Sequence, residues 1–213
     1  MSNIVYVSVE ANIGAGKTTM IGHIREKFPE YRIVDEPVHI WQALKDAAGK
    51  SLLENFYCDR TRWSYTFQNA AFITRIMGAA AELEKAKSEA ASDQKIVIIS
   101  ERGILTDRHV FASMLRADGS MNPLEWELYT YWFDHFSKNV KIDGIIYVTT
   151  DSSVCKDRIK IRGRQGEEGI SQEYLDELHK YHENWLNNTD LPVLRIASEP
   201  SELDKVASFV QSL

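Results

Sequence analysis

The chain has 213 residues, of which 44% are hydrophobic and 26% are charged, and its formal net charge is −6. This composition is typical of a globular protein and excludes a low-complexity or disordered chain. The negative charge argues against a protein whose main partner is a nucleic-acid backbone, because that partner requires clustered positive charge.

Cysteine usage and the N-terminal sequence bear on where the protein works. Cys58 and Cys155 are far apart and match no metal-ligand spacing, so neither a disulfide framework nor a zinc site is indicated. The N-terminal segment lacks the basic region and cleavage pattern of a signal peptide, and no stretch is apolar for long enough to span a bilayer. We therefore expect one cytoplasmic domain over residues 1–213, with no membrane partner. A location in the nucleus or an organelle is the alternative.

The first predicted element is a strand over residues 4–9, followed by a loop and then a helix from about Thr18. The loop, residues 10–18, fits the phosphate-binding pattern G-x-x-x-x-G-K-[ST] except at Ala11, where that pattern has glycine. Alanine fits any backbone with negative φ, so we expect this departure to matter little. The alternative is an ordinary strand-to-helix turn with a chance match.

A phosphate-binding loop gathers backbone N–H groups at the positive end of the helix that follows it. Lys17 is then expected to reach the β- and γ-phosphates of a nucleotide, and Thr18 to help hold Mg²⁺. The loop residues that we expect to contact the nucleotide are Asn12, Ile13, Gly14, Ala15, Gly16, Lys17, Thr18 and Thr19.

A second predicted strand covers residues 31–35 and ends at Glu36, because Pro37 keeps the residue before it extended. A short helix is expected at 41–47, and one or two long helices at 52–87. An aromatic and aliphatic stripe at helical spacing in that long stretch indicates core packing or a subunit interface. Its members are Phe56, Trp63, Phe67, Phe72 and Ile76.

A buried strand over residues 95–100 follows and ends at Glu101-Arg102. Helices are predicted at 105–115 and 123–137, a strand at 142–148, and a helix to about 161 that Ser152 or Ser153 caps. A helix at 171–186, a strand at 192–196 and a closing helix from 201 complete the chain. This alternation predicts an α/β fold, a central parallel sheet of about five strands flanked by helices.

Charged groups follow three of the predicted strands, and the carboxyl ends of parallel strands meet at one edge of the sheet. Phosphoryl transfer to a hydroxyl requires a proton acceptor and cations along the phosphates. Glu36 is suited to accept the proton and Glu101 to bind Mg²⁺, directly or through water. Arg102 is suited to stabilise the transferring phosphoryl group. The alternative for each residue is a helix cap or a surface ion pair.

The segment 158–169 concentrates positive charge in an otherwise acidic chain, and its glycines would let it move as a lid. A solvated, salt-bridged face is the alternative, since Glu167 and Glu168 lie in the same segment. The arginines expected to bind phosphates are Arg158, Arg162 and Arg164.

Several ordered motifs, spread over nearly the whole chain, together carry a family resemblance. They are residues 12–18, residues 36–38 with Trp41, residues 62–68, Glu101-Arg102 followed by Asp107-Arg108, residues 143–147 and the lid at 158–169. With these motifs the chain resembles the deoxynucleoside kinases of the deoxycytidine, deoxyguanosine and insect multisubstrate group. The resemblance implies a P-loop kinase fold and ATP-dependent phosphorylation, with Mg²⁺, of a deoxynucleoside 5′-hydroxyl in nucleotide salvage.

The resemblance also implies roles for single residues. Glu36 is similar to the family's general base and has Arg102 beside it. Trp41 and Phe111 resemble the apolar walls of the nucleoside pocket, with Phe111 stacked on the base. Gln68 would make paired hydrogen bonds to the base edge, and the sugar 3′-hydroxyl would be held by Tyr57 and Glu167.

Arg75 and Asp107 match a pair that the deoxycytidine and deoxyguanosine kinase branch carries and the thymidine-preferring branch lacks. A guanidinium held by a carboxylate leaves less room for the thymine methyl group. By resemblance we expect deoxycytidine and purine deoxynucleosides to be preferred over thymidine. The alternative is a purely structural ion pair.

Two other functions are compatible with a phosphate-binding loop. A nucleoside monophosphate kinase has an acceptor that is already ionised and needs no base, so Glu36 favours a nucleoside acceptor. A non-catalytic nucleotide-binding protein would be expected to lose Glu36, Arg102 or the lid arginines, and all are present. By resemblance we also expect a homodimer built from the helix around 63–76 and the helix that begins at Pro123.

Overall fold

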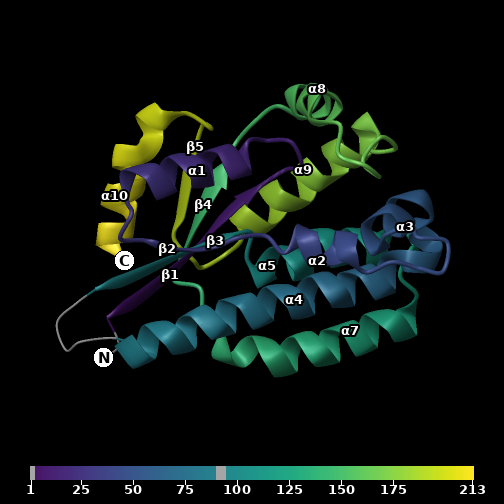
Figure 1. Cartoon of the computed structure of the whole chain (residues 1–213), viewed down its shortest axis with the longest axis horizontal. Coiled ribbons are helices and arrows are strands. Elements are labelled where there is room, and N and C mark those ends of the chain that lie inside the picture. Colours follow the sequence, from purple (N-terminus) through teal and green to yellow (C-terminus); the bar gives the residue numbers. More distant parts are fainter. Residues whose placement is uncertain (1–2, 90–94) are drawn as a thin grey trace.

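The computed structural model describes residues 3–89 and 95–213. Its centre is an all-parallel, five-stranded sheet with the order β2-β3-β1-β4-β5 (Figure 1). The strands are β1 (Ile4–Ala11), β2 (Arg32–Val34), β3 (Ile96–Glu101), β4 (Gly144–Val148) and β5 (Val193–Ile196). The predicted α/β architecture is therefore confirmed. β1 is the middle strand, so the loop that follows it opens at the centre of the sheet's carboxyl edge.

Helices cover both faces of the sheet (Figure 1). On one side α1 (Lys17–Lys27) packs beside α10 (Leu203–Ser212), and on the other α4 (Arg60–Glu89) runs along α7 (Pro123–Phe136). The other helices are mostly short and lie near the carboxyl edge of the sheet, but the longer α9 (Gln172–Asn187) also packs on the sheet, where His182 stacks on Tyr147 of β4 and Glu183 pairs with Arg195 of β5. These helices are α2 (Val38–Ala43), α3 (Leu52–Cys58), α5 (Ile104–Thr106), α6 (Ser113–Ala117), α8 (Ser152–Arg162) and α9.

The central strands have no exposed side. β3 and β4 are buried along their whole length, as are all residues of β1 after Ile4. This explains why their sequences read as nearly continuous apolar runs rather than alternating ones. Polar residues inside such strands, among them Ser8 and Glu10, are fully buried, and burial of a polar group is costly unless it is hydrogen-bonded.

Several boundaries differ from the sequence-based prediction. The short helix expected at 41–47 instead covers Val38–Ala43, because it begins directly after Pro37 and the backbone is already extended at Leu44. The cap of α8 is Asp151 rather than Ser152 or Ser153, because its carboxylate accepts from the Ser153 N–H at 2.8 Å. The helix expected at 105–115 is interrupted by a π-helical segment, Asp107–Ala112. β1 continues to Ala11, so part of the expected loop belongs to the strand. Short 3₁₀ turns follow α7 (Ser137–Asn139) and precede α10 (Pro200–Glu202).

Among residues 3–89 and 95–213, no helix combines the length and the apolar character needed to cross a membrane.

Candidate active site

The phosphate loop is shaped by two glycines with left-handed backbone, Gly14 (φ 79°) and Gly16 (φ 94°). A Cβ on Gly14 would lie 2.5 Å from the carbonyl oxygen of Cys155, and one on Gly16 would lie 2.4 Å from Oγ of Ser198. Both positions therefore require glycine. Ala11 instead ends β1 beside Val148 and does not have positive φ, so alanine is accommodated there without strain.

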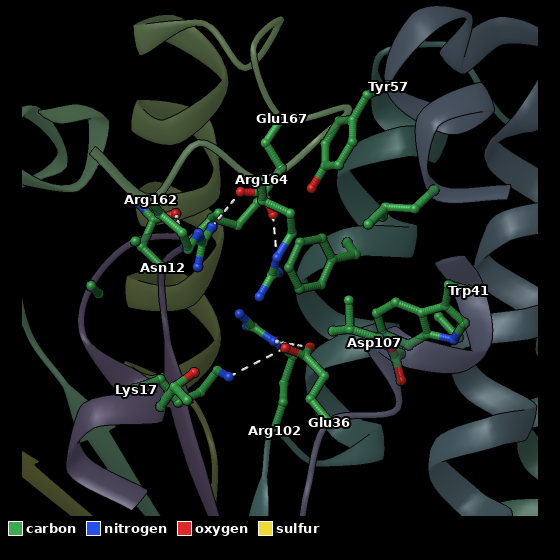
Figure 2. Close-up of a pocket in the computed structure, with 18 of the residues that line it drawn as sticks. Asn12, Lys17, Glu36, Trp41, Tyr57, Arg102, Asp107, Arg162, Arg164 and Glu167 are labelled. Atoms are coloured by element: carbon green, nitrogen blue, oxygen red, sulfur yellow. Dashed lines mark hydrogen bonds and ion pairs between the residues drawn. The ribbon is translucent and has the colours of Figure 1, made fainter. Parts of the chain in front are cut away.

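The groups that follow the first three strands converge at the base of the site, as Figure 2 shows for Lys17, Glu36 and Arg102. The Lys17 ammonium lies 2.7 Å from Oε1 of Glu101 and 3.4 Å from Oε2 of Glu36. Thr18 donates through Oγ1 to the same Glu101 oxygen at 2.5 Å. The predicted meeting of the strand ends is thus present, with a carboxylate on each side of the loop lysine.

Glu36 accepts from three cationic side chains. Besides Lys17, Arg102 Nε lies 3.2 Å from its Oε1, and Arg75 Nη2 lies 2.5 Å from the same oxygen. Burial by itself would raise the pKa of Glu36, but the charges of Lys17, Arg75 and Arg102 outweigh it and hold the pKa well below its usual range. Glu36 is therefore an ionised carboxylate at neutral pH.

Arg75 bridges Glu36 and Asp107, since its second terminal nitrogen bonds Oδ1 of Asp107. Burial opposes the charge of Arg75, but the two carboxylates raise its pKa above the ordinary value. Burial raises the pKa of Asp107 to about 6, because Arg75 offsets only part of the desolvation cost. Arg75, Asp107 and the candidate base Glu36 therefore form one connected network of ion pairs.

A cavity of about 370 Å³ opens above this network. Every site residue predicted from the sequence lines it, apart from Glu101, which lies beneath Lys17 and Thr18. The lining includes the phosphate loop at one end and the predicted nucleoside pocket at the other. The lining residues that were predicted for the nucleoside pocket and the lid are Trp41, Tyr57, Gln68, Arg75, Asp107, Phe111, Arg158, Arg162, Arg164 and Glu167.

The end of the cavity where the nucleoside is predicted to bind has apolar walls and unpaired polar atoms. Trp41 packs edge-on to Phe67, with ring centroids 5.3 Å apart, and the Arg102 guanidinium lies 4.9 Å from the centroid of the Phe111 ring. Three buried atoms of lining residues have no hydrogen-bond partner within the described chain, namely Gln68 Oε1, Arg75 Nε and Asp107 Oδ2. Buried polar atoms normally pair, and these three are exceptions in residues that line the cavity.

The lid arginines are held by the protein itself. Arg158 donates through Nη1 to the Ala15 carbonyl at 3.1 Å, on the phosphate loop. Arg162 and Arg164 lie 2.5 and 3.1 Å from the two carboxylate oxygens of Glu167, which is 3% exposed. In Figure 2 the Tyr57 hydroxyl points toward this group. Arg162 and Arg164 are therefore salt-bridged and also line the cavity, whereas phosphate binding and movement of the lid stay predictions.

Some residues of the site escaped the sequence-based prediction. Val38, Leu53, Phe67 and Ala71 complete the apolar walls. Ala71 and Phe67 lie about one and about two helical turns before Arg75 on α4, so helical spacing would have found them. Ser198, which donates to the Gly16 carbonyl at 2.9 Å, lies far away in sequence and carries no recognisable signal.

The oxygen groups of Thr18 and Glu101 fit a Mg²⁺ site that a bound nucleotide completes. Mg²⁺ is commonly held by one or two carboxylates together with substrate phosphates and waters, rather than by a protein cage. The described residues contain no group of three or more His, Cys, Asp or Glu side chains placed to hold a metal by themselves.

Comparisons with known proteins identify the family of this chain. The deoxynucleoside kinase family model matches residues 7–211. The chain is 36% identical to deoxycytidine kinase of Bos taurus and 33% identical to that of Mus musculus, in each case over 100% of this chain and 90% of the relative. It is 31% identical to a mitochondrial deoxyguanosine kinase of Xenopus laevis, over 91% of this chain and 81% of that protein. The chain therefore belongs to the deoxynucleoside kinase family.

Proposed function

We propose that this protein transfers the γ-phosphoryl group of ATP to the 5′-hydroxyl of a deoxynucleoside, as one kinase domain that serves nucleotide salvage. The observation that carries the proposal is the contact between Lys17 of the phosphate loop and Glu36 at the base of a single cavity. One cavity thus joins a phosphate-donor site to a carboxylate placed to receive a hydroxyl proton.

The donor end is formed by residues 12–19 and the lid arginines. Backbone N–H groups of the loop bind the phosphates, and Lys17 turns from its carboxylate partners to the β- and γ-phosphates. Arg158, Arg162 and Arg164 add positive charge from above. Thr18 and Glu101 would hold Mg²⁺, which supplies charge neutralisation along the phosphates when it is bound.

At the acceptor end, Glu36 orients the 5′-hydroxyl and accepts its proton as the bond to phosphorus forms. When Lys17 moves to the phosphates, Glu36 loses one of its three cationic neighbours and becomes more basic at the moment when a base is needed. Arg102 stays beside Glu36 and stabilises the transferring charge. Tyr57 and Glu167 hold the sugar 3′-hydroxyl.

The base lies between Trp41 and Phe111, with Gln68 at its edge. The free donor and acceptor atoms of Arg75, Asp107 and Gln68 suit a base with a polar edge. The bulk of the Arg75–Asp107 pair disfavours the thymine methyl group, so deoxycytidine and purine deoxynucleosides are preferred over thymidine. The names of the relatives, deoxycytidine and deoxyguanosine kinase, support this preference.

We also propose that the protein is a homodimer joined through α4 and α7. These helices expose a row of large apolar side chains along their outer faces. The row consists of Ile73, Met77, Leu124, Leu128, Tyr131, Trp132 and Phe136. The cytoplasmic location expected from the sequence stays a prediction, to be checked by cell fractionation, since one relative is named as mitochondrial.

A coupled assay of ADP formation tests the proposed function, with ATP, Mg²⁺ and each of the four deoxynucleosides in turn. We expect turnover with deoxycytidine or a purine deoxynucleoside, and kcat/KM at least about tenfold lower with thymidine. Turnover only with nucleoside monophosphates would favour a monophosphate kinase, and no turnover with any acceptor would overturn both.

A further inference from the structure

Arg102 has a backbone conformation that its residue type rarely adopts. Its φ is +71°, and it is the one non-glycine residue with positive φ among residues 3–89 and 95–213. Such a conformation persists only where the surrounding structure enforces it. Here it turns the chain sharply at the end of β3 and directs the guanidinium to Glu36 and to the Ala11 carbonyl, 2.9 Å away.

Two hydrogen bonds to β1 hold this turn. Arg102 donates its backbone N–H to the Val9 carbonyl at 3.0 Å. The next residue, Gly103, donates its N–H to Oε1 of Glu10 at 2.8 Å. The first bond is backbone to backbone and is available to any sequence, whereas the second depends on the Glu10 side chain.

The turn at Gly103 packs in close contact with β1, the strand that carries Glu10. A Cβ on Gly103 would lie 2.9 Å from Cβ of Ser8 and 3.1 Å from Oε1 of Glu10. Gly103 is buried in this place, so without the carboxylate its N–H would be left unpaired and out of reach of water.

Glu10 itself is expensive to bury. It is 0% exposed in the middle strand of the sheet, and its other oxygen, Oε2, has no partner within the described chain. A buried carboxylate with a single hydrogen bond adds little to packing that an apolar residue would not add. The one hydrogen bond that the Glu10 side chain makes in the described part of the chain, from the Gly103 N–H, is therefore what an apolar residue could not replace.

We propose that Glu10 is a positioning residue that fixes the Arg102 guanidinium against Glu36 by accepting the Gly103 N–H. This inference rests on the proposed role of Arg102 in phosphoryl transfer. Loss of the acceptor lets the turn relax toward negative φ, which moves the guanidinium away from the reacting groups. Because Arg102 acts on the transition state, the loss falls on kcat rather than on substrate binding.

The test compares Glu10→Met, which keeps the length of the side chain but lacks an oxygen, with Glu10→Gln, which keeps an acceptor. Ser8→Ala is the matched control, because Ser8 is equally buried on the same strand beside Gly103 but makes no bond to the turn. We expect Glu10→Met to lower kcat by about 10- to 100-fold, as small misplacements of catalytic groups do. We expect Glu10→Gln and Ser8→Ala to stay within about threefold of the wild type, and the dissociation constant of the deoxynucleoside to be unchanged in all three.

A double-mutant cycle decides whether Glu10 acts through Arg102. In an Arg102→Ala background, Glu10→Met should lower kcat by less than about twofold, because the group that it positions is gone. The proposal would be overturned if Glu10→Met lowered kcat in the Arg102→Ala background as much as it does in the wild type. A Glu10→Gln variant as slow as Glu10→Met would also overturn it. Glu10→Ala carries the same expectations and replaces Glu10→Met if that variant does not fold.

The cycle also separates this inference from the proposed function. A wild-type protein without deoxynucleoside turnover contradicts the proposed function whatever Glu10 does. An Arg102→Ala variant with full kcat leaves that function intact but contradicts the role of Arg102, and with it the role of Glu10. A slow Arg102→Ala variant together with a Glu10→Met variant as fast as Ser8→Ala contradicts only the role of Glu10.

Discussion

Arg75 donates to Oε1 of Glu36 across 2.5 Å while its other terminal nitrogen bonds Asp107. The side chain expected to select the base is therefore in direct contact with the side chain expected to accept the proton. A change at Arg75 alters the room beside the base, and it also removes one of three cations from Glu36. The proposed roles in substrate selection and catalysis would therefore be coupled through this one guanidinium.

We predict that Arg75→Met combined with Asp107→Ala shifts preference toward thymidine, because both a bulky group and its buried counter-charge leave together. The ratio of kcat/KM for thymidine to kcat/KM for deoxycytidine should rise by about 10- to 100-fold, because a pocket typically discriminates against one extra carbon by a factor in this range. Arg32→Met, which removes an arginine paired with Glu82 and Glu89 far from the cavity, is the control. Unchanged ratios would show that the pair is only structural.

We predict that Ala11→Gly leaves the affinity for ATP within about twofold of the wild type and lowers stability by roughly 0.5–1 kcal/mol. Ala11 lies in β1 without positive φ, so glycine relieves no strain and only adds freedom to the unfolded chain. ATP titration and thermal unfolding of both proteins check this. A marked gain in ATP affinity would show that alanine distorts the loop.

The sequence predicts correctly those features that depend on local patterns, such as hydrophobic runs and helical spacing. The parallel strands and the residues at their carboxyl ends follow from hydrophobic runs that stop at charged residues, so Lys17, Glu36 and Arg102 were correctly expected to meet. The long aromatic segment was also correctly read as helical, and the structure divides it into α3 and α4 at Asp59.

The features that escaped prediction depend on contacts between distant segments. Arg102 adopts positive φ because β1 anchors the turn on each side of it, which no local propensity indicates. The π-helical segment Asp107–Ala112 lies between α5 and α6, where the sequence pattern is that of an ordinary helix. The cap of α8 was placed one or two residues late because Asp151 competes with two serines in the same short turn.

His182 supplies a pH-dependent prediction. It is fully buried, donates through Nδ1 to the Leu178 carbonyl at 2.7 Å and stacks on Tyr147. Burial, aided by the nearby charge of Arg102, lowers its pKa to about 3. In the unfolded chain His182 takes up a proton as the pH falls through about 6.5, whereas in the folded chain it stays neutral down to about pH 3. The stability that neutral His182 allows is therefore complete above pH 6.5 and falls as the pH drops below it. The loss should reach about 2 kcal/mol at pH 5.

Denaturant unfolding at pH 7 and pH 5 measures this effect. We expect His182→Gln to lose about 2 kcal/mol less than the wild type between these pH values, because glutamine does not titrate. His179→Gln, on the same helix but partly exposed, is the control. Equal losses for wild type and His182→Gln would remove His182 from this role.

The outer face of α4 and α7 gives a prediction about assembly. Leu128→Glu combined with Trp132→Glu places two charges in the middle of the proposed interface, where they would be desolvated without partners. We expect the protein to change from a dimer to a monomer in sedimentation experiments. Ile161→Glu, at a position on α8 that is 86% exposed, should leave the dimer intact. A wild-type protein that sediments as a monomer contradicts the proposed interface.

The central claim is that Glu36 accepts the proton of the deoxynucleoside 5′-hydroxyl, and Glu36→Gln tests it most directly. Glutamine keeps the shape and one acceptor oxygen of the side chain but is not basic. We predict that kcat falls by about 10²- to 10⁴-fold, as removal of a general base does, while the dissociation constant of the deoxynucleoside changes by less than about threefold. A Glu36→Gln variant that binds the deoxynucleoside normally and turns it over at a near wild-type rate would contradict the account.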